Sequence, residues 1–338
     1  MTTAGERLIM GTTTAVRSIL SALAPLAMLI AVASAGFGGT GAAVASDVSH
    51  AIGDYARECA QRIAPLPAFD CLKGERIPIT VDGVEPETYV PDMPCDRPSL
   101  LTAPAGGDGY CVPNSRALVL RDDDKAQISA YCRQTTIRPD DTDIFDEVNV
   151  IVHGLDTGST CWFQSKDVQG GFNARNVPAP EDPVAGAAFW KTPEQTAAGN
   201  CVSCHDSDPF MYSPYYAQTH ALPSNPLGKY ANDIGKPFQE WEKPKSVSTP
   251  GNTCTTCHRI GNMQSCNLSM YQSFDPTLVK QIDDWGKQFP QSHWMPPGDL
   301  HSQAQWNVIY ADSIAKLGRC CQHPEAPECV VEPIPGGG

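Results

Sequence analysis

Apolar positions repeat at the spacing of helical turns toward the end of the chain. A capping-box sequence at 302–305 marks where a helix begins, and an apolar stripe follows on one of its faces. Such a stripe is more often packed core than the wall of a cofactor site. Helices are also expected over 275–289 and over 47–63, where Pro65 and Pro67 end the second of these. The stripe residues are Trp306, Ile309, Tyr310, Ile314 and Leu317.

Short apolar runs between turn residues predict strands in the first half of the chain. IPITV at 77–81 and RALVL at 116–120 are two such runs. The runs VNVIVHG at 148–154 and STCWFQS at 159–165 flank the turn sequence LDTG and predict a β-hairpin. The segment DKAQISAYCRQ, 124–134, is expected to be helical.

A stretch rich in proline and glycine at 173–190 divides two regions of different character. The region before it, 46–172, is predicted to be a disulfide-rich domain of short strands and hairpins. The region after it, 191–330, is predicted to be mainly helical and rich in loops, and a capping box at 192–195 begins its first helix. The fold class is therefore α+β, and residues 331–338 are expected to form a flexible tail.

The first 45 residues have the pattern of a secretory signal peptide. Basic residues precede an apolar run over 18–36, and small residues suitable for cleavage follow, so that cleavage is expected after Ala35 or Ala45. The alternative is an uncleaved anchor, but the run is barely long enough to span a membrane and contains Pro25. We therefore expect a periplasmic or extracellular protein with no stable membrane insertion after residues 1–45 are removed.

The composition indicates a globular, loop-rich and acidic protein. Its 338 residues include 30 prolines and 28 glycines, 41% of them are hydrophobic, and the formal net charge is −14. Removing the predicted signal peptide leaves the chain strongly acidic. This charge argues against binding to nucleic acid or to an anionic membrane surface, and it is compatible with a basic partner protein.

Ten of the fourteen cysteines are expected to form structural disulfides. An exported chain meets an oxidising compartment, and ten, being even, allows every one of them to pair. Sequence does not fix their connectivity, but proximity favours bonds between neighbours. These pairs are Cys59–Cys71, Cys95–Cys111 and Cys132–Cys161, with Cys266, Cys320, Cys321 and Cys329 pairing among themselves.

The other four cysteines lie in two copies of one motif, CVSCH at 201–205 and CTTCH at 254–258. In an exported protein C-x-x-C-H predicts covalent attachment of haem c. Two thiols at this spacing reach both vinyl groups of one haem and form thioethers, and the following histidine lies below the iron. Two covalent haems are therefore expected.

Two other uses of paired cysteines fit the sequence less well. A zinc ribbon brings together two C-x-x-C pairs about 15 to 20 residues apart. Here 49 residues separate Cys204 from Cys254. A thioredoxin-like redox pair does not need the histidine and belongs to a βαβ setting, which the sequence around these motifs does not predict.

These motifs and a later methionine make residues 191–320 resemble the c-type cytochromes. The resemblance implies a loop-rich cytochrome c-like fold with haem thioethers at Cys201, Cys204, Cys254 and Cys257, and with His205 and His258 as proximal ligands. In such cytochromes a methionine from a proline-rich loop often binds the far face of the haem. The loop SHWMPPGDL, 292–300, resembles that loop, with Met295 as the ligand and His293 as its rival.

The far face of the first haem has no such loop. Met211 follows His205 too closely to cross easily to the other face, so a core position is favoured for Met211. His220, on the following loop, and His153, at the tip of the predicted hairpin, are the candidate ligands, although a lone histidine is more often a satisfied surface or core residue. His153 is slightly favoured because the N-terminal region is the material available to complete the first haem pocket.

The function that these features favour is electron transfer. An exported dihaem cytochrome would pass single electrons between redox partners, and no residue is assigned a catalytic role. One alternative is a dihaem enzyme, either peroxidase-like or an oxidoreductase of small molecules, whose first haem keeps an open face. Another is a binding module built on the disulfide-rich region. A protein ligand on the far face of the first haem favours the carrier, and an open pocket there favours the enzyme.

Overall fold

The described part of the chain contains both helices and strands, which confirms the predicted α+β class. The structure is a computed structural model of the full chain. The residues described are 40–81, 84–90, 93, 112–210, 219, 223, 227–256, 259–266 and 303–337.

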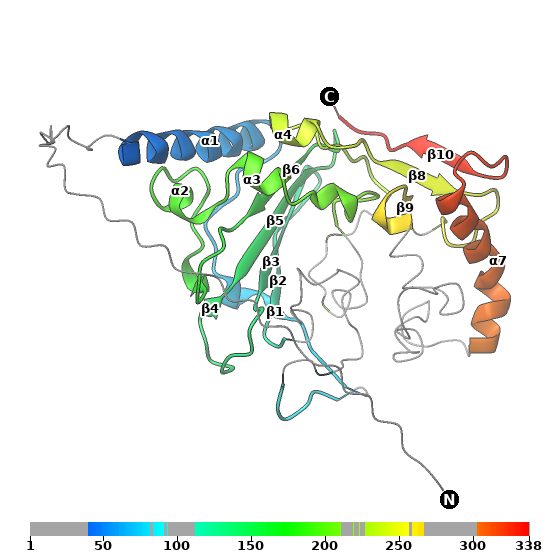
Figure 1. The fold of residues 1–338 in the computed structure, drawn as a ribbon, viewed down its shortest axis with the longest axis horizontal. Coiled ribbons are helices and arrows are strands. Elements are labelled where there is room, and N and C mark those ends of the chain that lie inside the picture. The colour runs from blue at the N-terminus through cyan, green and yellow to red at the C-terminus, as the bar shows by residue number, and fades with distance from the viewer. Residues whose placement is uncertain are drawn as a thin grey trace, which may run out of the picture. The chain divides into compact units, whose positions relative to one another are not determined.

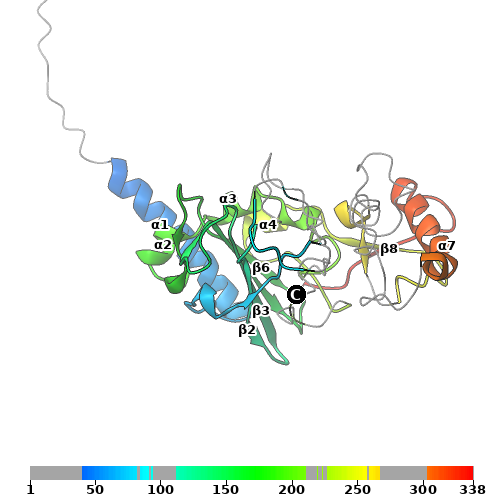
Figure 2. The same cartoon turned by 90° about the horizontal axis from the view of Figure 1, so that it is seen from below.

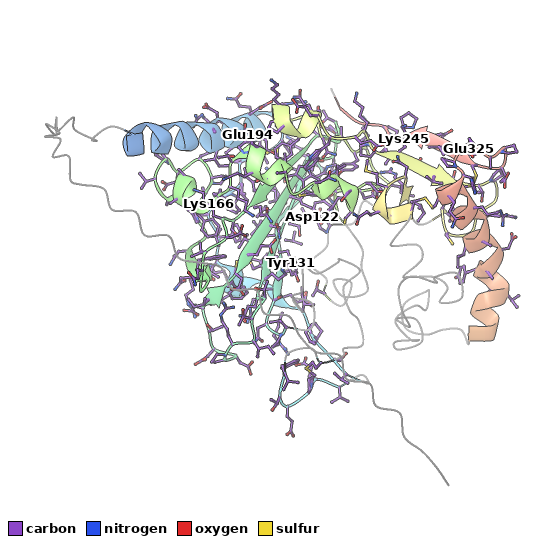
Figure 3. All side chains as sticks on the ribbon, in the orientation of Figure 1. Asp122, Tyr131, Lys166, Glu194, Lys245 and Glu325 are labelled. Carbon is purple, nitrogen blue, oxygen red and sulfur yellow. A yellow bond between two sulfur atoms is a disulfide. The ribbon has the colours of Figure 1, made fainter. Side chains whose placement is uncertain are left out.

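An antiparallel sheet of five strands forms the centre of the first half, in the order β1-β2-β3-β5-β6 (Figure 1). The predicted strand at 116–120 and the predicted hairpin at 148–165 are confirmed by β2, β5 and β6. Figure 3 marks β2 and β3 by the labelled side chains of Asp122 and Tyr131. The bounds are β1 Glu75–Arg76, β2 Arg116–Asp122, β3 Ala126–Arg133, β5 Glu147–Gly154 and β6 Thr160–Gln164.

The helix expected over 124–134 is wrong, because this segment forms β3 between β2 and β5. Nearly all of β3 is buried, since it has neighbours on both sides and is covered on both faces. Ile128, Ala130 and Cys132 lie on one face, and polar residues alternate with them. The period-two alternation was present in the sequence and outweighs the helix-forming residues around it.

The strand expected over 77–81 is also wrong. Ladder pairing ends at Arg76, and of the predicted strand only Val81 forms a bridge, with Val84. The apolar residues are nevertheless core, because Ile77 and Ile79 are buried with Ala117 in a small separate cluster. The apolar run therefore marked burial rather than a strand.

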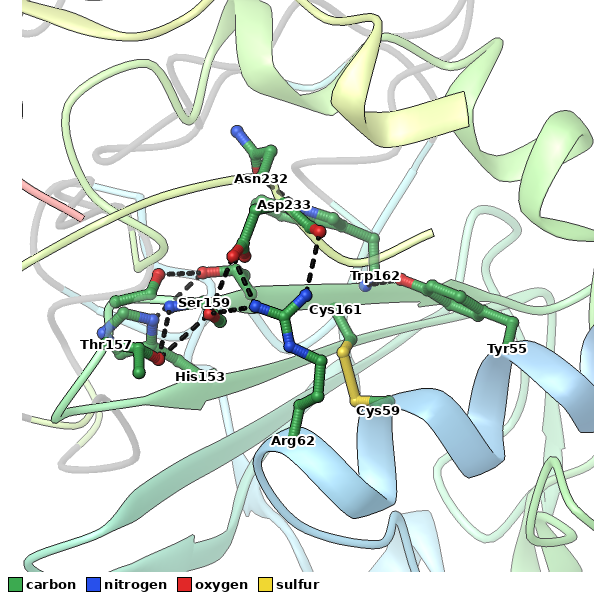
Figure 4. Close-up of a disulfide and its surroundings, with 12 residues drawn as sticks. Tyr55, Cys59, Arg62, His153, Thr157, Ser159, Cys161, Trp162, Asn232 and Asp233 are labelled. Carbon is green, nitrogen blue, oxygen red and sulfur yellow. Dashed lines mark hydrogen bonds and ion pairs between the residues drawn. A yellow bond between two sulfur atoms is a disulfide. The ribbon is translucent and has the colours of Figure 1, made fainter. Parts of the chain in front are cut away.

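Helix α1, Thr40–Arg62, lies alongside the large sheet and contains most of the predicted helix at 47–63 (Figures 1 and 2). Its Cys59 is bonded to Cys161 of β6, and the Tyr55 hydroxyl accepts a hydrogen bond of 2.8 Å from the Trp162 backbone N–H (Figure 4). Because β6 is the edge strand, this bond satisfies a donor that the ladder leaves free.

Two of the predicted disulfide pairs are wrong. Cys59 bonds to Cys161, and Cys71, in the short helix η1 (Cys71–Lys73), bonds to Cys132 of β3. Cysteines adjacent in sequence lie apart here because α1 and η1 pack against different strands of the sheet. The expectation that the last four cysteines pair among themselves is confirmed by Cys266–Cys321 and Cys320–Cys329. Cys95 and Cys111 lie outside the described residues.

The stretch at 173–190, predicted to be a linker, carries structure of its own. It contains the short helix η2 (Ala174–Asn176) and α2 (Ala185–Phe189), and its last residue, Trp190, is fully buried in the large core cluster. The capping box after it is confirmed, since Thr192 and Gln195 bond each other's backbone at the start of α3 (Pro193–Ala197). The division into domains at this stretch stays a prediction.

A second, smaller cluster forms around α7, Gln303–Gln322, which confirms the predicted C-terminal helix. Of the predicted stripe, Ile314 and Leu317 are buried and Tyr310 packs against them, whereas Ile309 is 42% exposed. A sheet of order β10-β8-β9 lies in the same part of the chain, and Lys245 in Figure 3 marks the start of β8. Its strands are β8 Lys245–Ser248, β9 Ile260–Gly261 and β10 Val330–Pro333.

The last residues, expected to form a flexible tail, are instead paired. β10 forms an antiparallel ladder with β8, and Ile334 is buried in the large core cluster. The backbone N–H of Tyr230 donates a bond of 2.7 Å to the Pro335 carbonyl, and the Gly337 N–H donates one of 2.8 Å to the Thr157 carbonyl. Backbone hydrogen bonds and the buried Ile334 side chain hold this segment in place, although its composition is typical of a flexible tail.

No helix within the described residues is both long and apolar enough to cross a membrane.

Candidate functional site

The first cysteine motif forms a tight helical turn after α3. The short helix η3, Cys201–Ser203, is closed by backbone bonds from Cys204 N–H and His205 N–H to the Cys201 carbonyl. Asn200 before it adopts the left-handed conformation, with φ of 49°. This turn places both thiols and the imidazole on one short segment, as the spacing of the motif predicts.

The described motif cysteines are free of disulfides. Cys201, Cys204 and Cys254 are unpaired, although the chain forms disulfides elsewhere. Burial raises the pKa of Cys201 to about 11 and also raises the pKa of Cys204 and Cys254. These groups are therefore neutral thiols at neutral pH, available for thioether bonds.

The His205 imidazole has the tautomer that a metal ligand needs. Its Nδ1 lies 2.9 Å from the Pro209 carbonyl oxygen, which only accepts hydrogen bonds, so Nδ1 carries the proton. Within the described residues Nε2 has no hydrogen-bond partner. Burial lowers the pKa of His205 to about 4, although the bond to Pro209 acts in the opposite direction. The ring is thus neutral, with a free lone pair on Nε2, and a backbone carbonyl fixes its orientation.

Aromatic side chains from both halves of the chain lie near His205. The Trp162 ring on β6 lies edge-on to the imidazole with 5.1 Å between ring centroids, and Trp241 lies 5.8 Å from Trp162. The Tyr230 hydroxyl donates a bond of 2.7 Å to the His205 carbonyl. The first motif therefore packs against the sheet of the first half rather than against α7.

The second motif begins against α7. Cys254 is buried with Ile314 and Leu317 in the smaller cluster, and its N–H donates to the Asn252 side chain at 3.0 Å. The Asn252 amide in turn donates to the Ser313 carbonyl of α7 at 2.9 Å. The C-terminal helix therefore fixes where this motif starts.

The two motifs are joined by Arg259, the residue that follows His258 in the sequence. One guanidinium nitrogen of Arg259 donates to the Ser207 carbonyl and to the Asp208 carboxylate, each at 3.0 Å. The other donates to the Gly228 carbonyl at 2.7 Å. The side chains of Arg259 and Asp208 are only 9% and 10% exposed, so this ion pair lies in the interior.

Further contacts connect the same two segments. The Asp206 carboxylate accepts bonds from the backbone N–H groups of Met263, at 2.6 Å, and Ser265, at 3.2 Å. The Cys204 thiol donates to the Gln264 side chain at 3.0 Å. The loop that begins at the first motif and the segment that follows the second motif therefore interlock through side chains from both.

The acidic groups of this junction are buried. Burial raises the pKa of Asp206 to about 6, and it acts in the same direction on the pKa of Asp208, where the Arg259 guanidinium opposes it and favours the charged carboxylate. The close approach also explains Gly261, because a Cβ atom there would lie 2.2 Å from the Asp206 carboxyl carbon.

His153 is buried at the end of β5, with 1% of its surface exposed. Its Nδ1 lies 3.0 Å from the Thr160 hydroxyl, and Phe210, from the loop after the first motif, lies edge-on to its ring at 6.1 Å. The structure thus brings His153 next to the loop that follows His205. The prediction of His153 as a haem ligand needs this proximity.

The remaining site residues of the sequence analysis cannot be placed. These residues are Cys257, His258, Met295, His220, Met211 and His293, and they lie outside the described residues.

Sequence reasoning missed the junction between the motifs. No role was predicted from the sequence for Asp206, Asp208 or Arg259. A signal was present, because residues of opposite charge follow the two motif histidines within three positions, Asp208 after His205 and Arg259 after His258. Only the fold shows that these charges meet.

No protein-family model, no curated protein and no solved structure matches this chain.

Proposed function

We propose that this protein is an exported dihaem c-type cytochrome that passes single electrons between redox partner proteins outside the cytoplasm. The observation that carries the proposal is the interlocking of the two cysteine motifs through Arg259, Asp206 and Cys204. Groups attached at both motifs would be close neighbours, as electron exchange between them requires.

The residues present at the first motif fit covalent haem. Cys201 and Cys204 offer two thiols without disulfides on one turn, and His205 offers a neutral imidazole whose Nε2 has no partner among the described residues. A haem bound there supplies reversible one-electron chemistry at its iron. The chain supplies an imidazole fixed by the Pro209 carbonyl and packed against the Trp162 ring, which in turn contacts Trp241.

Two other uses of the motif cysteines fit these surroundings less well. A reactive thiol pair has a lowered thiol pKa, whereas burial raises the pKa of Cys201 and Cys204. A zinc ribbon brings together two C-x-x-C pairs about 15 to 20 residues apart, whereas 49 residues separate Cys204 from Cys254. Haem attachment needs the thiols free and the imidazole apart from them, as they are here.

The proposal extends to the second motif and to the partner. Packing of α7 against Cys254 is what a cytochrome c-like C-terminal part requires, with His258 and Met295 as its axial ligands. The chain carries a net charge of −14, so a basic redox partner is the complementary choice. The signal-peptide pattern at 1–45 places the exchange in the periplasm or outside the cell.

Haem content tests the proposal directly. The protein is produced with a working cytochrome c maturation system, and its mass and pyridine haemochrome spectrum are measured. We expect two covalent haems per chain, one fewer in Cys201→Ala/Cys204→Ala, and one fewer in Cys254→Ala/Cys257→Ala. Breaking the Cys320–Cys329 disulfide with two alanines is the control and should leave both haems attached. Absence of haem from the unaltered protein would refute the proposal.

Electron transfer is tested on the same material. We expect both haems to be reduced and reoxidised reversibly by single electrons, and carbon monoxide to leave the reduced spectrum unchanged. The second candidate, a dihaem enzyme with an open first haem, would replace the carrier if carbon monoxide shifted half of the haem absorbance and peroxide were consumed.

A further inference from the structure

A row of polar side chains crosses one buried face of the large sheet. The residues Asp122, Gln127, His153 and Thr160 stand opposite one another on β2, β3, β5 and β6. Gln127, His153 and Thr160 are at most 3% exposed. The Gln127 amide donates to Asp122 at 3.0 Å, but its buried carbonyl oxygen has no partner in the described residues. A buried polar atom without a hydrogen-bond partner costs about 1–3 kcal/mol of stability, so a buried row of polar side chains calls for an explanation.

His153 in this row has the same tautomer as His205. The Thr160 hydroxyl directs its single proton to the Gly158 carbonyl at 3.1 Å, so its oxygen accepts from Nδ1–H of His153. Within the described residues Nε2 of His153 has no hydrogen-bond partner. Each of these two imidazoles thus has Nδ1 fixed by an acceptor and no partner for Nε2 among the described residues, which is the usual arrangement of histidine metal ligands.

The two imidazoles stand over the same face of the sheet. Thr160 and Trp162 are two residues apart on β6, so their side chains point the same way about 7 Å apart. His153 contacts the first of these residues and His205 packs against the second. Phe210, five residues after His205, packs on His153 and so provides a second connection between the two imidazoles.

We propose that Nε2 of His153 is the second axial ligand of the haem attached at Cys201 and Cys204. This inference rests on the proposed function and deepens it, because it makes the disulfide-rich half of the chain part of the cofactor site. The Cys59–Cys161 bond then helps to hold β6, the strand that pairs with the ligand-bearing strand β5 (Figure 4). Ligation by two histidines gives the first haem a lower reduction potential than a haem with one histidine and one methionine.

Substitutions at His153 test the inference in the full chain with both haems attached. In the unaltered protein we expect no binding of carbon monoxide. His153→Leu keeps an apolar side chain of similar size and should let carbon monoxide bind to one of the two haems. His153→Met offers a thioether instead, and should restore resistance to carbon monoxide, raise one reduction potential and add a sulfur-to-iron charge-transfer band.

Two further variants separate ligation from a merely structural role. Thr160→Val removes the acceptor for Nδ1–H but leaves Nε2 in place, so it should raise the potential of one haem without opening it. His323→Leu, at an exposed histidine beside Glu325, is the control and should change neither potential nor spectrum. If His153→Leu does not fold, the potentials of His153→Met and Thr160→Val decide.

Each outcome separates the two proposals. A chain without haem refutes the proposed function. Two haems of which one binds carbon monoxide in the unaltered protein overturn the role of His153 and favour an open first haem. Two closed haems that stay closed in His153→Leu, with unchanged potentials in Thr160→Val, also overturn it, and His220→Leu then identifies the ligand.

Discussion

Arg259 holds three oxygen atoms that come from two separate stretches of chain. It binds Asp208 and Ser207 after the first motif and Gly228 further on, with its side chain almost fully buried. Arg259→Met would leave the Asp208 carboxylate buried without its partner. We expect a loss of about 3–5 kcal/mol in the free energy of unfolding, measured by urea denaturation.

A matched pair of variants separates this junction from charge effects in general. Arg175→Met breaks an exposed ion pair with Asp143 and should change stability little. Arg259→Met/Asp208→Leu removes both buried charges and should recover part of the loss, because no lone charge then remains in the interior. Equal losses in Arg259→Met and in the double variant would show that Asp208 does not depend on Arg259.

Asp146 makes stability depend on pH in the acid range. Burial alone would raise its pKa, but bonds from Arg138 at 2.5 and 2.6 Å and from Thr135 N–H at 2.7 Å lower the pKa below its ordinary value. A carboxyl with a lowered pKa in the folded state stabilises above its unfolded value near 3.8, and this contribution is lost as the pH falls through the folded value.

Asp146→Asn should therefore be less stable than the unaltered protein at pH 7, by about 2 kcal/mol. The difference should shrink as the pH falls through the lowered pKa of Asp146, because the unaltered carboxyl then becomes protonated as well. Urea unfolding at a series of pH values checks this, and a difference independent of pH would contradict it.

At the scale of single residues, the sequence predicts local geometry better than it predicts contacts between distant residues. The spacing of Cys201, Cys204 and His205 indicates the motif without any structure, because local geometry decides it. The bond from His205 to Pro209 is also local. The meeting of Asp208 with Arg259 depends on how distant segments fold together, so no local pattern contains it.

Among the elements, the disulfides offer the sharpest prediction. Trypsin cleaves after Arg62 and so separates Cys59 from Cys71. Without reduction, we expect peptide 58–62 bonded to 134–166 and peptide 63–73 bonded to 126–133, as found by mass spectrometry. The reduced digest is the control, and a bond between 58–62 and 63–73 would contradict the Cys59–Cys161 pairing.

The elements that sequence predicts correctly are those with a strong local signal. The hairpin of β5 and β6 has period-two apolar runs on both sides of a turn, and α3 has its complete capping box. The failures at 77–81 and 124–134 have different causes. At 124–134 the period-two alternation of apolar residues outweighs the helix-forming residues around it, and at 77–81 the apolar run marks burial in a small cluster rather than a strand.

At the scale of the whole chain, the C-terminal segment connects the surroundings of both motifs. β10 pairs with β8 beside the cluster that contains Cys254, and Ile334 is buried in the large cluster that the first motif packs against. Pro335 then accepts from the backbone of Tyr230, whose hydroxyl binds the His205 carbonyl. A change at the C-terminal end should therefore reach the first motif.

Removal of residues 334–338 tests this connection. The truncated chain loses the burial of Ile334 and the acceptor for Tyr230, so we expect its free energy of unfolding to fall by about 2–4 kcal/mol. Because the Tyr230 hydroxyl bonds the His205 carbonyl, the absorption of the haem proposed at the first motif should change, while that of the haem proposed at the second should not. Removal of 336–338 alone keeps Ile334 and Pro335 and should have a smaller effect on both. If the longer truncation left stability and both haem spectra unchanged, the paired C-terminal segment would have no part in holding the first motif, and the aromatic packing around Trp162 would have to hold it alone.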